Sequence, residues 1–322
     1  MVRLLLAIAC VLAVAGCGST GGTDRPNRDA SLLLDFTPNG VHAGIYLATE
    51  RDYDEAEGVN LDVRAPGAST DALKLLQAGR VDMAILDIHD LALARENGAD
   101  VVGVMAVVQR PLAALLAQPA IARPRDLEGK RAGVTGLPSD VAVLRSIVQG
   151  DGGDPDKVKA TTIGFEAVKA LLARRVDAAT AFWNVEGVAL KARRPGMHEF
   201  RVDDFGAPAY PELVLCVTRA TLDDERPVIR ATIRALRRGY NEAQVDPESA
   251  VSALVDANPD LDRAAAAAQL DAVSPAFTAG ADVYGQLRAD VLDQWADWDL
   301  KFGIVKRPID VGSAFDRSLA AP

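Results

Sequence analysis

The 322-residue chain is poor in cysteine, in aromatic residues and in excess positive charge. Its cysteines, Cys10, Cys17 and Cys216, are too few for a disulfide scaffold. Aromatic residues make up 5% of the chain, so an aromatic side chain beside a loop is notable. The net charge of −10 argues against a nucleic-acid partner, which favours a basic face. A content of 49% hydrophobic and 25% charged residues excludes wholesale disorder and is typical of a folded protein.

The sequence has no apolar run of the roughly 20 residues that a membrane-spanning helix needs. The run from Leu4 to Gly16 follows Arg3 and is short enough for the apolar core of a secretory signal peptide over 1–16. It ends in small residues directly before Cys17, which resembles the bacterial lipobox. That resemblance implies cleavage before Cys17 and lipid attachment to its thiol. The alternative is an ordinary signal peptide with an incidental cysteine. Residues 17–30 then read as a flexible tether.

The body of the chain contains a strand–loop–helix pattern twice. The apolar run 31–34 leads through a Pro/Asn/Gly loop into a helical pattern over 41–51. Residues 130–134 lead through a similar loop into a helix beginning near Asp140, with Ser139 as its expected N-cap. A helix end, a turn and an apolar strand also recur at 76–87 and 171–183. Two such units predict two similar α/β domains.

We expect the first domain over 31–118 plus 217–322 and the second over 119–216. The segment after residue 226 is expected to be mostly helical. The apolar spacing predicts helices over 227–243, 247–258, 264–273 and 284–302. The tryptophans of the last helix are interpreted as core residues.

In open α/β sheets, ligands bind outside the carboxyl ends of the strands. Four segments fall at such ends: 35–36, 87–89, 135–136 and 183–186. They would bring acidic and aromatic side chains from both domains around one crevice.

The segment from Leu34 to Ala48 resembles the signature L-D-W-x-P-N-x-x-H-x-G-x-Y-x-A. That signature marks the family of thiamine-pyrimidine-precursor-binding lipoproteins of ABC importers, which also contains the fungal thiamine pyrimidine synthase. Weaker similarity includes 106–109, 183–187 and 205–210. The resemblance implies the type II periplasmic-binding-protein fold, with two α/β domains around a ligand cleft. It also implies a monomeric, non-enzymatic, lipid-anchored extracytoplasmic protein that captures a small nitrogen heterocycle by hinged closure and delivers it to an ABC permease, with no cofactor.

The chain departs from this family at one signature position, where Phe36 replaces tryptophan and keeps a stacking face. Riboflavin importers share much of the signature, so riboflavin is an alternative ligand. A small sulfonate bound at the helix start near Ser139 is another, although Asp35, Asp87 and Glu186 would repel an anion. An enzyme similar to the fungal synthase is the alternative of another class. That synthase needs a cysteine-rich motif, and no cysteine cluster, G-x-S-x-G, P-loop or H-E-x-x-H motif occurs here.

The strand ends and the signature together nominate the ligand-binding residues. Asp35 and Glu186 would accept from ligand amines. Phe36, Tyr46 and Trp183 would stack on a flat ring. The three histidines show no metal-ligand spacing, so no metal site is expected. The complete candidate set is Asp35, Phe36, Pro38, Asn39, His42, Tyr46, Asp87, His89, Gln109, Thr135, Trp183, Glu186 and Tyr210.

Overall fold

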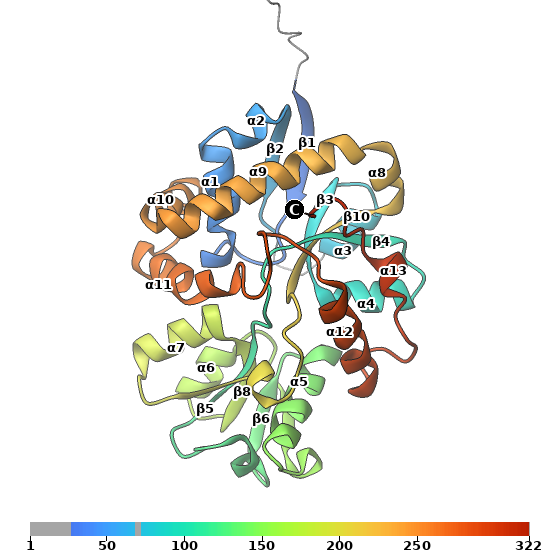
Figure 1. Cartoon of the computed structure of the whole chain (residues 1–322). Helices are drawn as coiled ribbons and strands as arrows, with labels where there is room; N and C mark the ends of the chain where they lie inside the picture. Colours follow the sequence, from blue (N-terminus) through green and yellow to red (C-terminus); the bar gives the residue numbers. More distant parts are fainter. Residues whose placement is uncertain (1–26, 68–71, 322) are drawn as a thin grey trace, which may run out of the picture.

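In the computed structural model, which describes residues 27–67 and 72–321, the chain forms two α/β domains, each built on a five-stranded sheet (Figure 1). This confirms the predicted fold class. The signal peptide and Cys17 lie outside the described residues. The first strand begins at Arg28, so the last residues of the predicted tether belong to the sheet.

The first sheet has the strand order β2-β1-β3-β10-β4. Its strands are β1 (Arg28–Leu33), β2 (Val59–Arg64), β3 (Met83–Asp87), β4 (Val101–Ala106) and β10 (Leu213–Thr218). β1 runs parallel to β2 and β3, whereas β10 is antiparallel to β3 and β4. β4 is buried along its whole length and β10 along nearly all of it, which explains why both read as continuous apolar runs.

The second sheet has the order β7-β6-β8-β5-β9. Its strands are β5 (Ala113–Ala117), β6 (Arg131–Val134), β7 (Lys159–Thr162), β8 (Ala178–Phe182) and β9 (His198–Arg201). β6 is parallel to β7 and β8, and β5 is antiparallel to β8 and β9. Each sheet therefore repeats one arrangement: three parallel strands, a fourth antiparallel to them, and a fifth beside it.

Helices cover both sheets. Those of the first domain are η1 (Gly40–His42), α1 (Ala43–Glu50), α2 (Tyr53–Ala56), α3 (Ala72–Gln77), α4 (Ile88–Glu96), α8 (Arg219–Asp224), α9 (Arg226–Val245), α10 (Pro247–Ala257), α11 (Arg263–Val273), η6 (Ser274–Ala276), α12 (Ala289–Lys301) and α13 (Val311–Ala314). Those of the second are η2 (Pro124–Leu127), α5 (Pro138–Gly150), η3 (Pro155–Lys157), α6 (Ala167–Leu172), the π-turn η4 (Trp183–Gly187), α7 (Val188–Arg193) and η5 (Val202–Phe205). None of the described helices is long and apolar enough to cross a membrane.

Two predicted helix starts are wrong. The last long helix begins at Ala289 rather than at 284, because Tyr284 and Gly285 form a turn in which Gly285 has a φ of +84°. The core interpretation of Trp295 and Trp298 is confirmed, since both are buried. The N-cap of α5 is Leu137, without a side-chain hydrogen bond, and Pro138 occupies the first turn. The predicted cap Ser139 lies inside the helix.

Two chain segments connect the sheets, 107–112 between β4 and β5 and 202–212 between β9 and β10. The boundary expected after residue 118 lies beyond β5, which is a strand of the second sheet. The boundary expected after residue 216 lies within β10, which is a strand of the first sheet. These boundaries could not be predicted because an apolar run does not reveal which sheet the strand joins. Since 107–112 and 202–212 connect the two sheets, we propose that they form the hinge.

Helix α9 crosses α1 at very short range (Figure 1). A Cβ on Gly44 of α1 would lie 2.5 Å from the ring of Tyr240, and a Cβ on Gly239 of α9 would lie 2.2 Å from the Gly44 carbonyl oxygen. Only glycines allow this approach. The Tyr240 hydroxyl donates to the Val41 carbonyl at 2.8 Å, so the crossing also positions the start of the helical segment that follows the signature loop.

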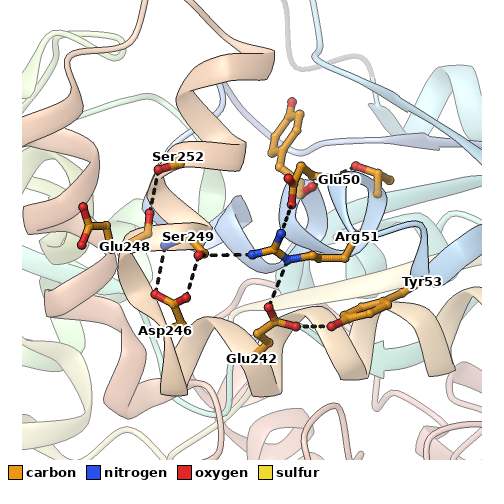
Figure 2. Close-up of polar contacts among 10 residues, drawn as sticks. Glu50, Arg51, Tyr53, Glu242, Asp246, Glu248, Ser249 and Ser252 are labelled. Atoms are coloured by element: carbon orange, nitrogen blue, oxygen red, sulfur yellow. Dashed lines mark hydrogen bonds and ion pairs between the residues drawn. The ribbon is translucent and has the colours of Figure 1, made fainter.

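A polar network on the outer face fastens α1 to α9 and α10 (Figure 2). Arg51, which directly follows α1, donates to Glu242 at 3.2 Å and to Ser249 at 3.3 Å. Tyr53 donates to the other Glu242 carboxylate oxygen, and Asp246 caps α10 through the Ser249 N–H at 3.1 Å. Partly exposed pairs of this kind contribute about 0–1 kcal/mol each, so the buried helix crossing carries more of the stability.

The substitution Gly239→Ala tests this crossing. Besides the Gly44 carbonyl oxygen, the Cβ added at position 239 would meet the Cβ of Ala48 at 2.7 Å. The clash exceeds the gain of about 1 kcal/mol in helix propensity, and we expect a net destabilisation of about 1–3 kcal/mol. Thermal unfolding followed by circular dichroism measures it. Gly67→Ala is the matched control because a Cβ there meets nothing within 4 Å. Equal melting temperatures for the two variants would contradict the prediction.

Candidate functional site

The carboxyl ends of strands from both sheets surround one cavity of about 160 Å³. Asp35 and Phe36 follow β1, Asp87 ends β3, and Thr135 follows β6. Phe182, the last residue of β8, completes this set of strand ends. The arrangement is the one expected for a ligand site in an open α/β sheet.

On the first-domain side, a buried histidine orients Asp35. Nε2 of His42 lies 2.9 Å from a carboxylate oxygen of Asp35. Nδ1 of His42 accepts from the Asn39 N–H at 3.2 Å, which leaves Nε2 as the donor to Asp35. The Asn39 side chain accepts from the Val41 N–H at 3.0 Å and caps the short helix η1. Asp35 and Asn39 line the cavity, while His42 supports Asp35 from behind.

Phenylalanine rings from both domains face the cavity. Phe36 approaches Phe165, from the loop before α6, with ring centroids 6.2 Å apart at an angle of 40°. The side chain of Phe165 is 57% exposed, although large apolar side chains are usually buried. Phe182 lines the same cavity at the end of β8. These rings offer apolar faces from the two sides of the cleft.

A buried ion-pair cluster extends from the cavity wall, where His89 lies, to Asp299 and Tyr210 behind it. Nδ1 of His89 lies 2.8 Å from the Asp299 carboxylate of α12, and Nε2 lies 3.2 Å from the Tyr210 hydroxyl. Burial opposes the charged form of His89, but Asp299, Asp87 and Glu212 outweigh it and raise the pKa of His89 to about 10. His89 is therefore a cation at neutral pH, paired with a residue 210 positions away along the chain.

Glu212 connects the two hinge segments. One of its carboxylate oxygens accepts from the N–H groups of Leu112, at 2.6 Å, and Ala113, at 3.0 Å. Leu112 ends the first hinge segment and Glu212 ends the second. The other oxygen of Glu212 lies 4.0 Å from Nε2 of His89. A single buried carboxylate thus joins both hinge segments to His89 in the cavity wall.

On the second-domain side, the Thr135 backbone N–H donates to Asp140 at 2.7 Å, and the Thr135 hydroxyl also donates to Asp140. Glu186 accepts from the Phe182 N–H at 3.3 Å. Asn184 lines the cavity and is fully buried, and neither its amide oxygen nor its amide nitrogen has a hydrogen-bond partner in the described structure. A buried amide without partners carries a cost of about 1–3 kcal/mol.

The structure brings seven of the predicted residues to the cavity wall: Asp35, Phe36, Asn39, Asp87, His89, Thr135 and Glu186. The others do not line it within the described part of the chain: Pro38, His42, Tyr46, Gln109, Trp183 and Tyr210.

Most of the residues away from the wall have structural contacts. The Trp183 indole donates to the Pro111 carbonyl at 2.9 Å and packs under Arg201. Tyr46 is buried in α1. Gln109 donates to the Gln286 carbonyl at 2.9 Å.

Sequence reasoning missed part of the wall. Beyond the candidate set, the polar or aromatic lining residues are Asp90, Ser139, Asp140, Phe165, Thr180, Phe182, Asn184 and Glu212. A strand-end signal was available for Phe182, which immediately precedes the nominated Trp183. Glu212 lies two residues after Tyr210, but nothing local distinguishes it from a surface glutamate.

Asp87, His89 and Glu212 offer possible metal-ligand atoms within 4.8 Å of one another. A metal ion bound there would have to displace the proton of His89 and the Tyr210 contact. Nδ1 and Nε2 of His89 are already engaged by protein groups. We therefore interpret the group as an internal ion-pair cluster.

Comparisons with known proteins identify the family and the fold. Residues 39–250 match the family model described as NMT1/THI5 like. The chain is 32% identical over 259 residues to the formylaminopyrimidine-binding protein of Halalkalibacterium halodurans, covering 79% of this chain and 78% of the relative. It is 24% identical over 241 residues to the 4-amino-5-hydroxymethyl-2-methylpyrimidine phosphate synthase of Legionella pneumophila, covering 72% and 74% of the two chains.

Among solved structures, the periplasmic aliphatic sulphonate-binding protein of Escherichia coli superposes with a TM-score of 0.73 at 17% identity. The match covers 91% of this chain and 99% of the other. At this identity the similarity establishes the fold, which is that of periplasmic binding proteins.

Asp299→Asn is expected to destabilise the protein by about 3–5 kcal/mol, because it leaves the buried His89 cation without its closest partner. The stabilisation from a raised histidine pKa is complete below the unfolded value of 6.5 and is lost as the pH rises toward about 10. The difference in melting temperature between wild type and variant should therefore be largest near pH 6.5 and shrink toward pH 10.

Asp297→Asn, on the exposed face of the same helix, is the control and should melt like the wild type. A difference between wild type and Asp299→Asn that stays constant across this pH range would refute the charged state assigned to His89.

Proposed function

Since the chain belongs to the NMT1/THI5-like family, we propose that it is the extracytoplasmic solute-binding protein of an ABC importer. Its ligand is a small nitrogen heterocycle of the thiamine-pyrimidine-precursor class. The observation that carries the proposal is the cavity between the two domains, which combines phenylalanine faces with directed polar groups from both sides. Ligand sites of this kind are mostly apolar with a few placed polar groups.

The two-segment hinge supports capture by domain closure. Each domain contributes part of the wall, so neither holds a complete site alone. Glu212 and His89 tie the hinge to that wall, and closure around a ligand would change their surroundings. In this proposal the closed, loaded form is what the permease recognises.

The proposed contacts follow from the wall residues. Phe36 and Phe182 stack on the ring, with Phe165 at the rim, while Asp35 and Glu186 accept from ligand N–H groups. This assignment replaces Trp183 with its neighbour Phe182, because Trp183 is engaged with Pro111 and Arg201. It also moves His42 and Tyr210 to supporting roles behind Asp35 and His89.

A sulfonate or riboflavin is a weaker candidate. The carboxylates around the cavity would repel a sulfonate in a desolvated site. Riboflavin is less favoured because the 32% identical relative is named for binding a formylaminopyrimidine.

A pyrimidine synthase is the alternative of another class, since one relative carries that name. The single cysteine of the described residues, Cys216, is fully buried in β10 and does not line the cavity. Burial raises the pKa of its thiol and keeps it protonated. Recovery of the incubated ligand unchanged, checked by mass spectrometry, supports binding, whereas a new product would support an enzyme.

Phe36→Ala and Phe182→Ala should each weaken binding of a formylaminopyrimidine about 5- to 150-fold, the equivalent of about 1–3 kcal/mol of ring stacking. Phe36→Trp should retain affinity because it restores the usual signature residue. Isothermal titration calorimetry measures the Kd. Phe302→Ala is the control, since its ring packs on Trp298 and not on the cavity. Unchanged affinity in both alanine variants would exclude these strand ends as the site.

We propose that Cys17, outside the described residues, carries the lipid that anchors the protein to the membrane. Cys17→Ser should leave the protein with its signal peptide attached or release it from the cells, because the acylated thiol is the anchor. Fractionation and intact mass of the membrane-bound form test this. A mature membrane protein without acyl mass on Cys17 would contradict it.

A further inference from the structure

The cavity wall has an excess of negative charge. Six acidic side chains line it, and among the described lining residues His89 is the only basic one: Asp35, Asp87, Asp90, Asp140, Glu186 and Glu212. The charge of His89 is shared with Asp299, which lies behind the wall at 2.8 Å. His89 offsets part of the charge of Asp299 and of its wall neighbours Asp87, Asp90 and Glu212, but it is one cation beside six wall carboxyl groups.

Four of these carboxylates already have partners that explain them. Asp35 accepts from His42, Asp87 caps α4 through the His89 N–H, Asp140 accepts from Thr135, and Glu212 accepts from two backbone N–H groups.

Asp90 and Glu186 differ from these four. In the described part of the chain, neither forms an ion pair with a protein cation. Their own contacts are weak: the Phe182 N–H reaches Glu186 at 3.3 Å, and the His89 cation only partly offsets the effect of burial on the pKa of Asp90.

Burial disfavours the charged forms of the carboxyl groups in the wall. Desolvation raises the pKa of Asp90 and of Glu186, which means that the charged forms are disfavoured without a counterion. The carboxyl groups of Asp87, Asp140 and Glu212 are shifted in the same direction for the same first reason. A cation entering the cavity would relieve this cost, whereas a neutral ligand would leave it in place and an anion would increase it.

We propose that the ligand is a cation: a heteroaromatic ring bearing an ammonium arm, selected over its neutral N-acylated form. This rests on the proposed function and specifies its ligand class. The phenylalanine faces hold the ring, and Glu186, with Asp90 on the opposite domain, receives the ammonium group. Asn184, whose buried amide has no partner in the described structure, lines the same cavity. The preference differs from the formylated ligand named for one relative.

The test compares an aminomethylpyrimidine, whose side arm is protonated at neutral pH, with its N-formyl derivative, whose arm is neutral. Both are titrated calorimetrically into the wild type. We expect the amine to bind at least about tenfold more tightly, in line with the strength of charge-assisted hydrogen bonds. Glu186→Gln should remove most of this advantage by weakening the amine about tenfold or more and the N-formyl compound much less, since the latter loses a neutral rather than a charge-assisted hydrogen bond.

Glu166→Gln is the matched control. It makes the same change in the same domain, next to Phe165, but Glu166 is exposed and paired with Lys169. It should alter neither affinity. Asp90→Asn provides a second variant should Glu186→Gln fold poorly, and it should also weaken the amine selectively.

Tighter or equal binding of the N-formyl compound to the wild type would overturn the preference for a cation and leave the proposed binding function standing. Equal losses for both ligands in Glu186→Gln and in Asp90→Asn would overturn the assignment of the ammonium to these carboxylates. Failure of both pyrimidines to bind would overturn the inference and the proposed function together.

Discussion

The contact between the Glu212 carboxylate and the backbone N–H groups of Leu112 and Ala113 holds the two hinge segments together. Other contacts between the domains, such as the hydrogen bond from the Trp298 indole of α12 to the Ser146 hydroxyl of α5 at 3.3 Å, join helices rather than the two hinge segments. Breaking these two hydrogen bonds is costly, because the buried carboxylate would lose its donors. Its second oxygen faces His89, so the hinge and the cavity wall share one electrostatic unit.

The contacts of His89 and Glu212 help to explain why the cavity wall can contain six acidic side chains. The His89 cation and the N–H donors offset part of the charge of Asp87, Asp299 and Glu212. The remaining cost is concentrated at the cavity, where a ligand replaces water. Binding proteins commonly place polar groups in this way, since a group satisfied only by the ligand contributes to specificity as well as to affinity. The unpartnered Asn184 amide fits the same interpretation.

Some aromatic side chains pack in the core and others line the cavity, and the residue type does not predict which. Trp183, Trp295 and Trp298 are buried in packing contacts, whereas the smaller Phe36, Phe165 and Phe182 line the cavity. The fold is shared with a protein that is named for binding aliphatic sulphonates. The acidic wall of this chain is therefore a local feature placed on a shared architecture.

The sequence by itself determined the two α/β domains, the strand ends that carry Asp35, Asp87 and Thr135, and the family signature, because these depend on apolar periodicity and on contiguous residues. Only the tertiary structure decided that Phe182 rather than Trp183 faces the cavity, since neighbouring side chains at a strand end point to opposite sides. It alone brought Asp299 to His89, a pairing between residues 210 positions apart that no local pattern encodes.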